Sequence, residues 1–119
     1  VTIPRRGGPQ RCFGPVADVV EGLAKLLDTP EAFGQVINLG NNEEVSIKQL
    51  AEKAMELTGS TSEVRYIPYE EAYGDGFEDM RRRVPSLAKA ARLIGYQPTR
   101  SLVDIINDVA DEYRRTQNR

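Results

Sequence analysis

The stretch EVSIKQLAEKAMELTG, Glu44 to Gly59, carries a complete helix signature. Ser46 can cap the first turn, and Gln49, three residues later, can complete a capping box. Gly59 can end the helix in a left-handed turn. The spacing therefore predicts a helix between Ser46 and Gly59, with a buried face made of Ile47, Leu50, Ala51, Ala54 and Leu57.

The residues before this helix predict a second helix followed by a strand. QVINLG, residues 35–40, has the β-branched and aliphatic composition of a strand and stands between Gly34 and Gly40. Before it, residues 16–27 form a helix pattern that Pro15 can start and that Thr29 and Pro30 close. Its apolar stripe, the pattern of a helix that faces a core, is Val16, Val19, Val20, Leu23, Leu26 and Leu27.

The residues after Gly59 predict a strand, a loop and two more helices. SEVRYIPY, residues 62–69, is typical of an edge strand that Pro68 ends. LAKAARLIG, residues 87–95, is a short helix stopped by Gly95, and Ser101 caps a last helix. That last helix has the stripe Leu102, Ile105, Ile106, Val109 and Tyr113, and residues 114–119 are expected to fray. The order indicates an α/β fold in which four or five helices pack on a short minor sheet.

The composition restricts the class of protein. The 119 residues are 39% hydrophobic and 29% charged, which suits a single globular domain. Residues 1–9 are expected to be a linker or join, with a turn at RRGGP, residues 5–9. The net charge of −2 argues against nucleic acid as a partner, and no apolar run reaches membrane-spanning length. The lone Cys12 favours a reducing cytoplasm. Without histidine, a structural zinc site and a Ser-His-Asp triad are excluded.

One loop raises the question of an anion site. YGDGFEDMRRRVPS, residues 73–86, combines Gly74 and Gly76 with three consecutive arginines, residues 81–83. Glycines let the chain approach a ligand closely, and guanidinium groups suit two-pronged contacts with phosphate or carboxylate. Glu78 and Asp79 could orient one arginine. The alternative is a solvated charge run that pairs with its own acids.

Four other features can be interpreted either way. Arg11 precedes a short extended segment that would hold it on a rigid element, although an ordinary surface arginine fits as well. Asp18 suits a first-turn acid that stabilises the helix dipole, and Cys12 suits a small core residue. Tyr66, Tyr69 and Tyr73 lie near the loop in the sequence. The simpler interpretation is that their rings pack against the protein while their hydroxyl groups contact water, without a role in a binding site.

The sequence contains no catalytic apparatus of its own. It has no Tyr-x-x-x-Lys pair, no glycine-rich dinucleotide fingerprint and no Walker-type loop. It also begins at Val1 rather than methionine, and we expect it to be part of a longer protein.

Three consecutive segments resemble one known family. QRCFGPVADVVEGLAKLL, GQVINLGNNEEVSIKQLAEKAMELTG and YEEAYGDGFEDMRRRVPSLAKAARLIGYQPTRSLVDII are similar, in this order, to the carboxyl-terminal substrate-binding part of extended short-chain dehydrogenases/reductases. The resemblance covers residues 10–113 and looks closest to NAD-dependent nucleotide-sugar epimerases and UDP-glucuronate decarboxylases. Where this family has a helix and a strand, RGGP at residues 6–9 is the whole connection here.

The resemblance implies a two-part enzyme. A Rossmann domain outside this chain would bind NAD and carry the catalytic Tyr and Lys, so this chain would bind no cofactor itself. The present chain would recognise a nucleotide diphosphate sugar such as a UDP-sugar, with Arg11, Tyr73 and Arg83 as its substrate-binding residues. Epimerase, dehydratase and decarboxylase activities all stay open. So does a non-catalytic interaction or scaffold module that kept the fold.

Overall fold

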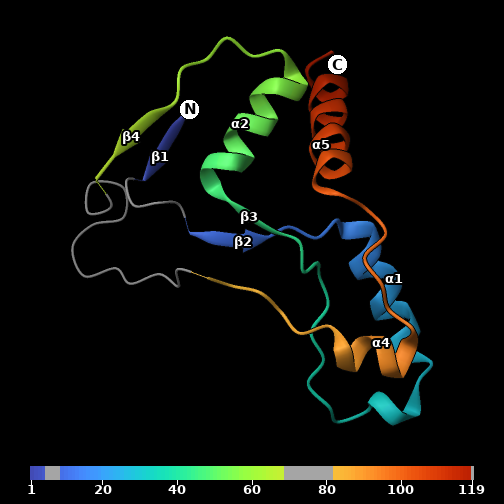
Figure 1. Ribbon diagram of the computed structural model, residues 1–119. Coiled ribbons are helices and arrows are strands. Elements are labelled where there is room, and N and C mark those ends of the chain that lie inside the picture. The colour runs from blue at the N-terminus through green and yellow to red at the C-terminus, as the bar shows by residue number, and fades with distance from the viewer. Residues whose placement is uncertain (5–8, 69–81, 119) are drawn as a thin grey trace.

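The computed structural model describes residues 1–4, 9–68 and 82–118 (Figure 1). Four α-helices, one short 3-10 helix and four short strands occur in these residues. In chain order they are β1 (Thr2–Pro4), β2 (Gln10–Cys12), α1 (Val16–Leu27), η1 (Pro30–Ala32), β3 (Glu44–Ser46), α2 (Ile47–Thr58), β4 (Arg65–Ile67), α4 (Ala88–Ile94) and α5 (Leu102–Gln117). The predicted α/β class is confirmed.

The strands form two separate pairs. β1 runs parallel to β4, with Ile3 opposite Tyr66, and β2 runs antiparallel to β3, with Arg11 opposite Val45. Ile3 is 1% exposed, so the first pair has a buried centre although each strand has three residues. The strand expected at residues 62–69 therefore exists in a shorter form, and β1 and β3 were not anticipated.

The predicted helix boundaries are confirmed by their caps. Ser46 accepts a hydrogen bond from the Gln49 amide at 3.1 Å, and the Gln49 side chain accepts one from the Ser46 amide at 2.9 Å. Ser101 and Asp104 form the same box at the start of α5. Gly59 and Gly95 end their helices with φ of 64° and 65°, a region that glycine enters without strain. α5 continues to Gln117, into the stretch expected to fray.

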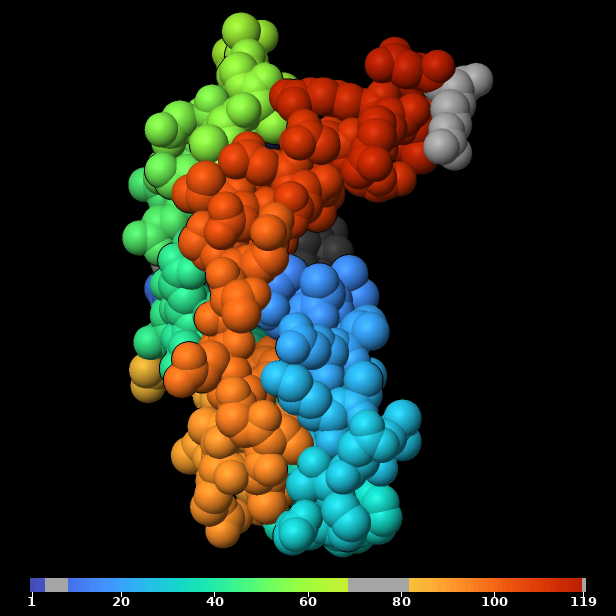
Figure 2. Space-filling model, turned by 90° about the vertical axis from the view of Figure 1, so that its right-hand side faces the viewer, coloured from blue at the N-terminus to red at the C-terminus, as the bar shows by residue number. Residues whose placement is uncertain are grey.

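The helices fall into two groups. α2 packs against α5, and α1 lies beside α4 at the other end of the molecule (Figures 1 and 2). Leu87, Ala90 and Tyr96 form a small core around α4, against which Ile37 and Leu39 pack. The radius of gyration is 17.2 Å, whereas a compact domain of this length has about 13.5 Å. The fold is therefore open, with several apolar side chains facing solvent.

Two polar contacts fasten α1 and the segment after it to the turn that follows α4. The buried Asp18 carboxylate accepts hydrogen bonds from the Thr99 amide at 3.0 Å and the Thr99 hydroxyl at 2.6 Å. The Tyr96 hydroxyl donates to the Gly40 carbonyl at 2.7 Å and accepts from the Gly40 amide at 3.1 Å. Asp18 lies in the first turn of α1, as expected of an acid that stabilises the helix dipole, and it also joins parts of the chain 81 residues apart.

The prediction of a strand at residues 35–40 is wrong for this structure. No strand of the described residues pairs with this segment, and Val36 is 86% exposed. A strand needs a neighbour that satisfies its alternating backbone groups. Here side chains bond single backbone groups instead, as when Lys89 Nζ donates to the Val36 carbonyl at 3.1 Å. Residues 35–40 have the composition of a strand, but without a pairing strand among the described residues they remain irregular.

Four of the six residues in the apolar stripe of α1 are exposed, while Val19 and Leu26 are half-buried. Val16, Val20, Leu23 and Leu27 are 77%, 56%, 53% and 77% exposed. The buried residues of α1 are Asp18 and Gly22. At 3.6 residues per turn, these two lie on the side of the helix opposite the exposed stripe. α1 therefore contacts the rest of the chain through its polar and glycine face.

Candidate functional site

The candidate anion site is built on the β2–β3 pair. Gln10, Arg11 and Cys12 lie opposite Ser46, Val45 and Glu44, respectively. A third segment joins them, because Gln10 forms a parallel bridge with Arg82 and the Arg83 amide donates to the Gln10 carbonyl at 3.3 Å. Two stretches separated by about seventy residues are thus joined side by side.

This arrangement brings two of the predicted site residues together. Arg83 is bonded through its backbone to the residue next to Arg11. Side chains alternate between the two faces of a sheet, and directly paired residues share a face. The bridge between Gln10 and Arg82 puts Arg82 on the face of Gln10. From the alternation of side chains along an extended segment, we infer that Arg83 shares the face of Arg11.

Arg11 provides a cationic group on a well-packed strand pair. The half-buried Arg11 guanidinium donates to the Gln10 carbonyl at 2.8 Å, which anchors the side chain near its own strand. Val45 is paired with Arg11, lies on the same face and is 7% exposed, so the strand beside the arginine is well packed. Arg83 is exposed. Tyr73, the third predicted site residue, lies outside the described residues, as do Glu78 and Asp79.

Sequence reasoning missed Glu44. Its carboxylate accepts two hydrogen bonds from Arg82, Nε at 2.6 Å and Nη2 at 2.9 Å. The acids expected to orient an arginine were neighbours in the loop, whereas this acid stands 38 residues earlier on β3. No local pattern could have found it, since only the β2–β3 pairing brings the two together.

The charges around this pair shift three pKa values. The hydrogen bonds from Arg82 hold the pKa of Glu44 below its ordinary value, and those to Glu44 raise the pKa of Arg82. Burial, and then the nearby Glu44 charge, raise the pKa of the Cys12 thiol. Cys12 is half-buried, and a raised pKa keeps it a neutral thiol, which agrees with a packing role rather than a nucleophilic one.

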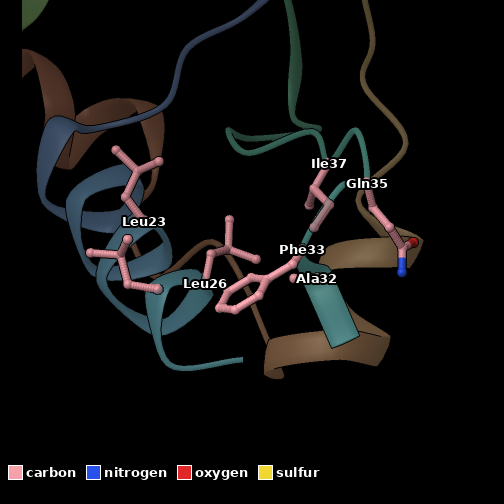
Figure 3. Close-up of a pocket in the computed structure, with 7 residues that line it drawn as sticks. Leu23, Leu26, Ala32, Phe33, Gln35 and Ile37 are labelled. Atoms are coloured by element: carbon pink, nitrogen blue, oxygen red, sulfur yellow. The ribbon is translucent and has the colours of Figure 1, made fainter. Parts of the chain in front are cut away.

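A second feature is an apolar hollow of about 290 Å³ at the other end of the molecule. Leu23 and Leu26 of α1 form one wall, and Phe33 and Ile37 form the other (Figure 3). Neither Arg11 nor Arg83 lines it. Its chemistry is that of a packing surface rather than a site for an anion.

The described residues offer no evident metal site, and two of their helix N-termini are unfavourable for a pyrophosphate. They contain no group of three His, Cys, Asp or Glu side chains that could hold a metal ion. The N-terminus of α1 has Pro15 as its cap residue and Asp18 in its first turn, and a pyrophosphate would meet that negative charge. At α2, the Ser46–Gln49 capping box occupies the N-terminal groups. None of the helices that the structure describes is long and apolar enough to cross a bilayer.

Comparisons with known proteins agree with this architecture. A UDP-N-acetyl-alpha-D-glucosaminuronate decarboxylase of Bacillus cytotoxicus is 30% identical over 112 residues, which are 94% of this chain and 35% of the relative. A Methanothermobacter thermautotrophicus epimerase superposes with a TM-score of 0.86 at 28% identity, over 98% of this chain and 33% of the other. No family model matches.

The chain corresponds to the carboxyl-terminal part of extended short-chain dehydrogenases/reductases. It spans about a third of the length of the relatives it matches. UDP-glucose 4-epimerase of Thermotoga maritima, solved with UDP-glucose, belongs to the same family and superposes with a TM-score of 0.85 at 26% identity, over 98% of this chain and 35% of the other. The family resemblance read from the sequence is therefore confirmed.

Proposed function

We propose that this chain recognises the nucleotide diphosphate sugar for an NAD-dependent epimerase, dehydratase or decarboxylase, with Arg11 and Arg83 as donors to the diphosphate. The observation that carries the proposal is the joining of β2 and the segment of Arg83 side by side. The decarboxylase relative and the UDP-glucose complex of the epimerase point to a UDP-sugar as the ligand. Tyr73 is assigned to the same pocket on the family resemblance.

A diphosphate has a chemistry that this arrangement can meet. It carries two negative charges and several acceptor oxygens, and guanidinium groups answer them with charge-assisted, two-pronged hydrogen bonds. Two such groups on backbone segments that are bonded to each other have a restricted separation, so less entropy is lost on binding. This chain would bind and orient the substrate.

The redox step belongs to a domain outside this chain. In the proposed enzyme, NAD takes a hydride from the sugar and returns it after the epimerisation, dehydration or decarboxylation. The sequence has no Tyr-x-x-x-Lys pair and no glycine-rich dinucleotide fingerprint. We therefore assign the cofactor and the catalytic residues to a Rossmann domain of the longer protein.

The exposed apolar surface supports such a partner domain. The outer stripe of α1 (Val16, Val20, Leu23 and Leu27), the hollow beside it and the strand-like residues 35–40 lie next to one another. Apolar surface of this kind on a soluble domain marks an interface. A sheet docked here would cover the stripe and give residues 35–40 the neighbouring strand that they lack.

Titration of UDP into the chain, followed by NMR, tests the substrate site. We expect chemical-shift changes concentrated at Arg11 and residues 82–83. The change Arg83→Ala should weaken binding roughly ten-fold or more, since a hydrogen bond between charged groups is lost. Arg92→Ala, on α4, removes the same charge elsewhere and should leave the affinity nearly unchanged. An absence of shifts at millimolar UDP would contradict the proposal and favour an interaction module.

In the longer enzyme, Arg83→Ala should weaken use of the sugar substrate and leave NAD binding intact. An equal loss of both would contradict the assignment of Arg83 to the substrate.

A further inference from the structure

Next to the proposed anion site, an acid and an arginine form a fork. Arg82 donates through two nitrogens to the two oxygens of Glu44, at 2.6 and 2.9 Å. This planar, two-pronged contact is the most directional form of an ion pair. It joins β3 to the segment that enters α4, across 38 residues of sequence.

The fork lies on the opposite face of the small sheet from the two substrate arginines. Arg82 bridges Gln10, and Glu44 pairs with Cys12, so these four residues share one face. Alternation of side chains places Arg11 and Arg83 on the other face. A substrate contacting the second face would not touch the fork.

The fork can set the register of the Arg83 segment. The Arg83 amide donates to the Gln10 carbonyl at 3.3 Å, next to the isolated parallel bridge between Gln10 and Arg82. A backbone bond of 3.3 Å is long and the bridge is an isolated one, so a side-chain contact can add to the hold on this edge segment. A slip by one residue would turn Arg83 to the face of Cys12 and Arg82 to the face of Arg11. The contact with Glu44 favours one of these two registers.

We propose that Glu44 and Arg82 are positioning residues: their fork holds residues 82–83 in register on β2, so that Arg83 shares a face with Arg11. This proposal rests on the proposed function, in which Arg83 contacts the diphosphate. The hydrogen bonds from Arg82 lower the pKa of Glu44, which means that the pair stabilises the charged acid, and this agrees with the role.

The direction in which UDP affinity changes in Glu44→Gln distinguishes a positioning role from a purely electrostatic one. Glu44→Gln removes a negative charge near a site for an anion, so long-range electrostatics alone predicts tighter UDP binding. A positioning role predicts weaker UDP binding, because without the contact to Glu44 the segment of Arg83 spends less time in the register that places Arg83 beside Arg11. With an exposed ion pair, we expect UDP affinity to fall by about two- to five-fold. Glu56→Gln, which removes an ion-paired acid from α2, is the matched control.

The experiment combines UDP titration with hydrogen exchange of amides in the 119-residue chain. The variants are Glu44→Gln, Arg82→Lys and the exchanged pair Glu44→Arg with Arg82→Glu. Arg82→Lys keeps the charge but cannot form the fork, so it should also weaken binding and speed exchange at the Arg83 amide. The exchanged pair can form the fork again, and we expect it to restore both readouts toward the wild type.

The outcomes are distinct. Faster exchange at Arg83 with unchanged protection in α2 and α5, and recovery in the exchanged pair, supports the proposal. Tighter UDP binding in Glu44→Gln with unchanged Arg83 exchange overturns it. Loss of protection throughout α2 and α5 also overturns it, because Glu44 would then serve the whole fold. If the wild type binds no UDP, the proposed function fails, while Arg83 exchange still decides whether the fork sets the register.

Discussion

α1 and α2 are both twelve residues long and both have an apolar stripe, yet they are held in different ways. α2 has a complete capping box, ends in a left-handed glycine and turns its half-buried stripe toward α5. α1 has no side-chain cap and turns its stripe to solvent. The apolar periodicity of a helix thus predicts that one face will be buried, but it does not predict whether that face packs against the same chain or against another domain.

The two faces of α1 explain its position. Its inner face is Asp18 and Gly22, which contact Thr99, Tyr96 and Leu39. A glycine there allows close approach, and the carboxylate supplies a directional contact. The outer face carries apolar side chains and no such partner among the described residues. We interpret α1 as a helix placed between two bodies, with one of them in this chain.

The largest effect on stability is expected from a substitution that disrupts the contact of α1 with the rest of the chain at Gly22. A Cβ on Gly22 would meet the Leu39 methyl carbons at 3.1 and 3.2 Å and the Tyr96 ring at 3.2 Å. Gly22→Leu overpacks this contact, and we expect the free energy of unfolding in urea to fall by about 3 kcal/mol. Ala24→Leu adds volume on an exposed position of α1 and should change it by less than about 0.5 kcal/mol. Equal costs for both would show that α1 is not docked through Gly22.

The next effect concerns Asp18. Asn at this position can accept one of the two hydrogen bonds from Thr99 and leaves the other donor facing an amide group. We expect Asp18→Asn to cost about 2 kcal/mol of unfolding free energy, measured by circular dichroism in urea. Asp28→Asn, at the exposed end of α1, should have little effect.

The same residue makes stability depend on pH. Burial alone would raise the pKa of Asp18, but the hydrogen bonds from Thr99 and Arg100 outweigh it, so the folded-state pKa is lowered. A lowered pKa stabilises the fold fully above the unfolded value, near pH 4, and this stabilisation is lost as the pH falls through the folded value. Urea titrations from pH 6 to 2 should show a smaller loss in Asp18→Asn than in the wild type. Parallel curves would contradict this role.

A smaller loss of stability is expected when the N-cap residue of α2 or α5 is removed. Ser46→Ala removes the acceptor for the Gln49 amide, and we expect the free energy of unfolding to fall by about 1 kcal/mol. Ser101→Ala, at the matching position of α5, should cost a similar amount. A change below the error of the urea titration in both variants would mean that packing of α2 on α5, and not capping, holds these helices.

How far the sequence predicts this fold follows from the range of each interaction. Helix ends were predictable because caps such as Ser46–Gln49 and Gly59 act within a few residues. The strand at residues 35–40 was not, since strand formation depends on a neighbour that local composition does not reveal. Arg11 and Arg83 came from a family resemblance, and their placement on adjoining segments required the structure. The fork partner of Arg82 could not be predicted, because pairing of β2 with β3 creates it.

The smallest effect on stability is expected from the outer stripe of α1. Changing Leu23 and Leu27 together to Ser removes side chains that are 53% and 77% exposed, and should alter the free energy of unfolding by less than about 0.5 kcal/mol. Leu57→Ser, on the half-buried stripe of α2, should cost about 1–2 kcal/mol. Binding of a hydrophobic fluorescent dye should fall in the first variant and not in the second. A large loss of stability in the α1 variant would mean that this chain already covers the stripe, and the case for a docked second domain would lose its main support.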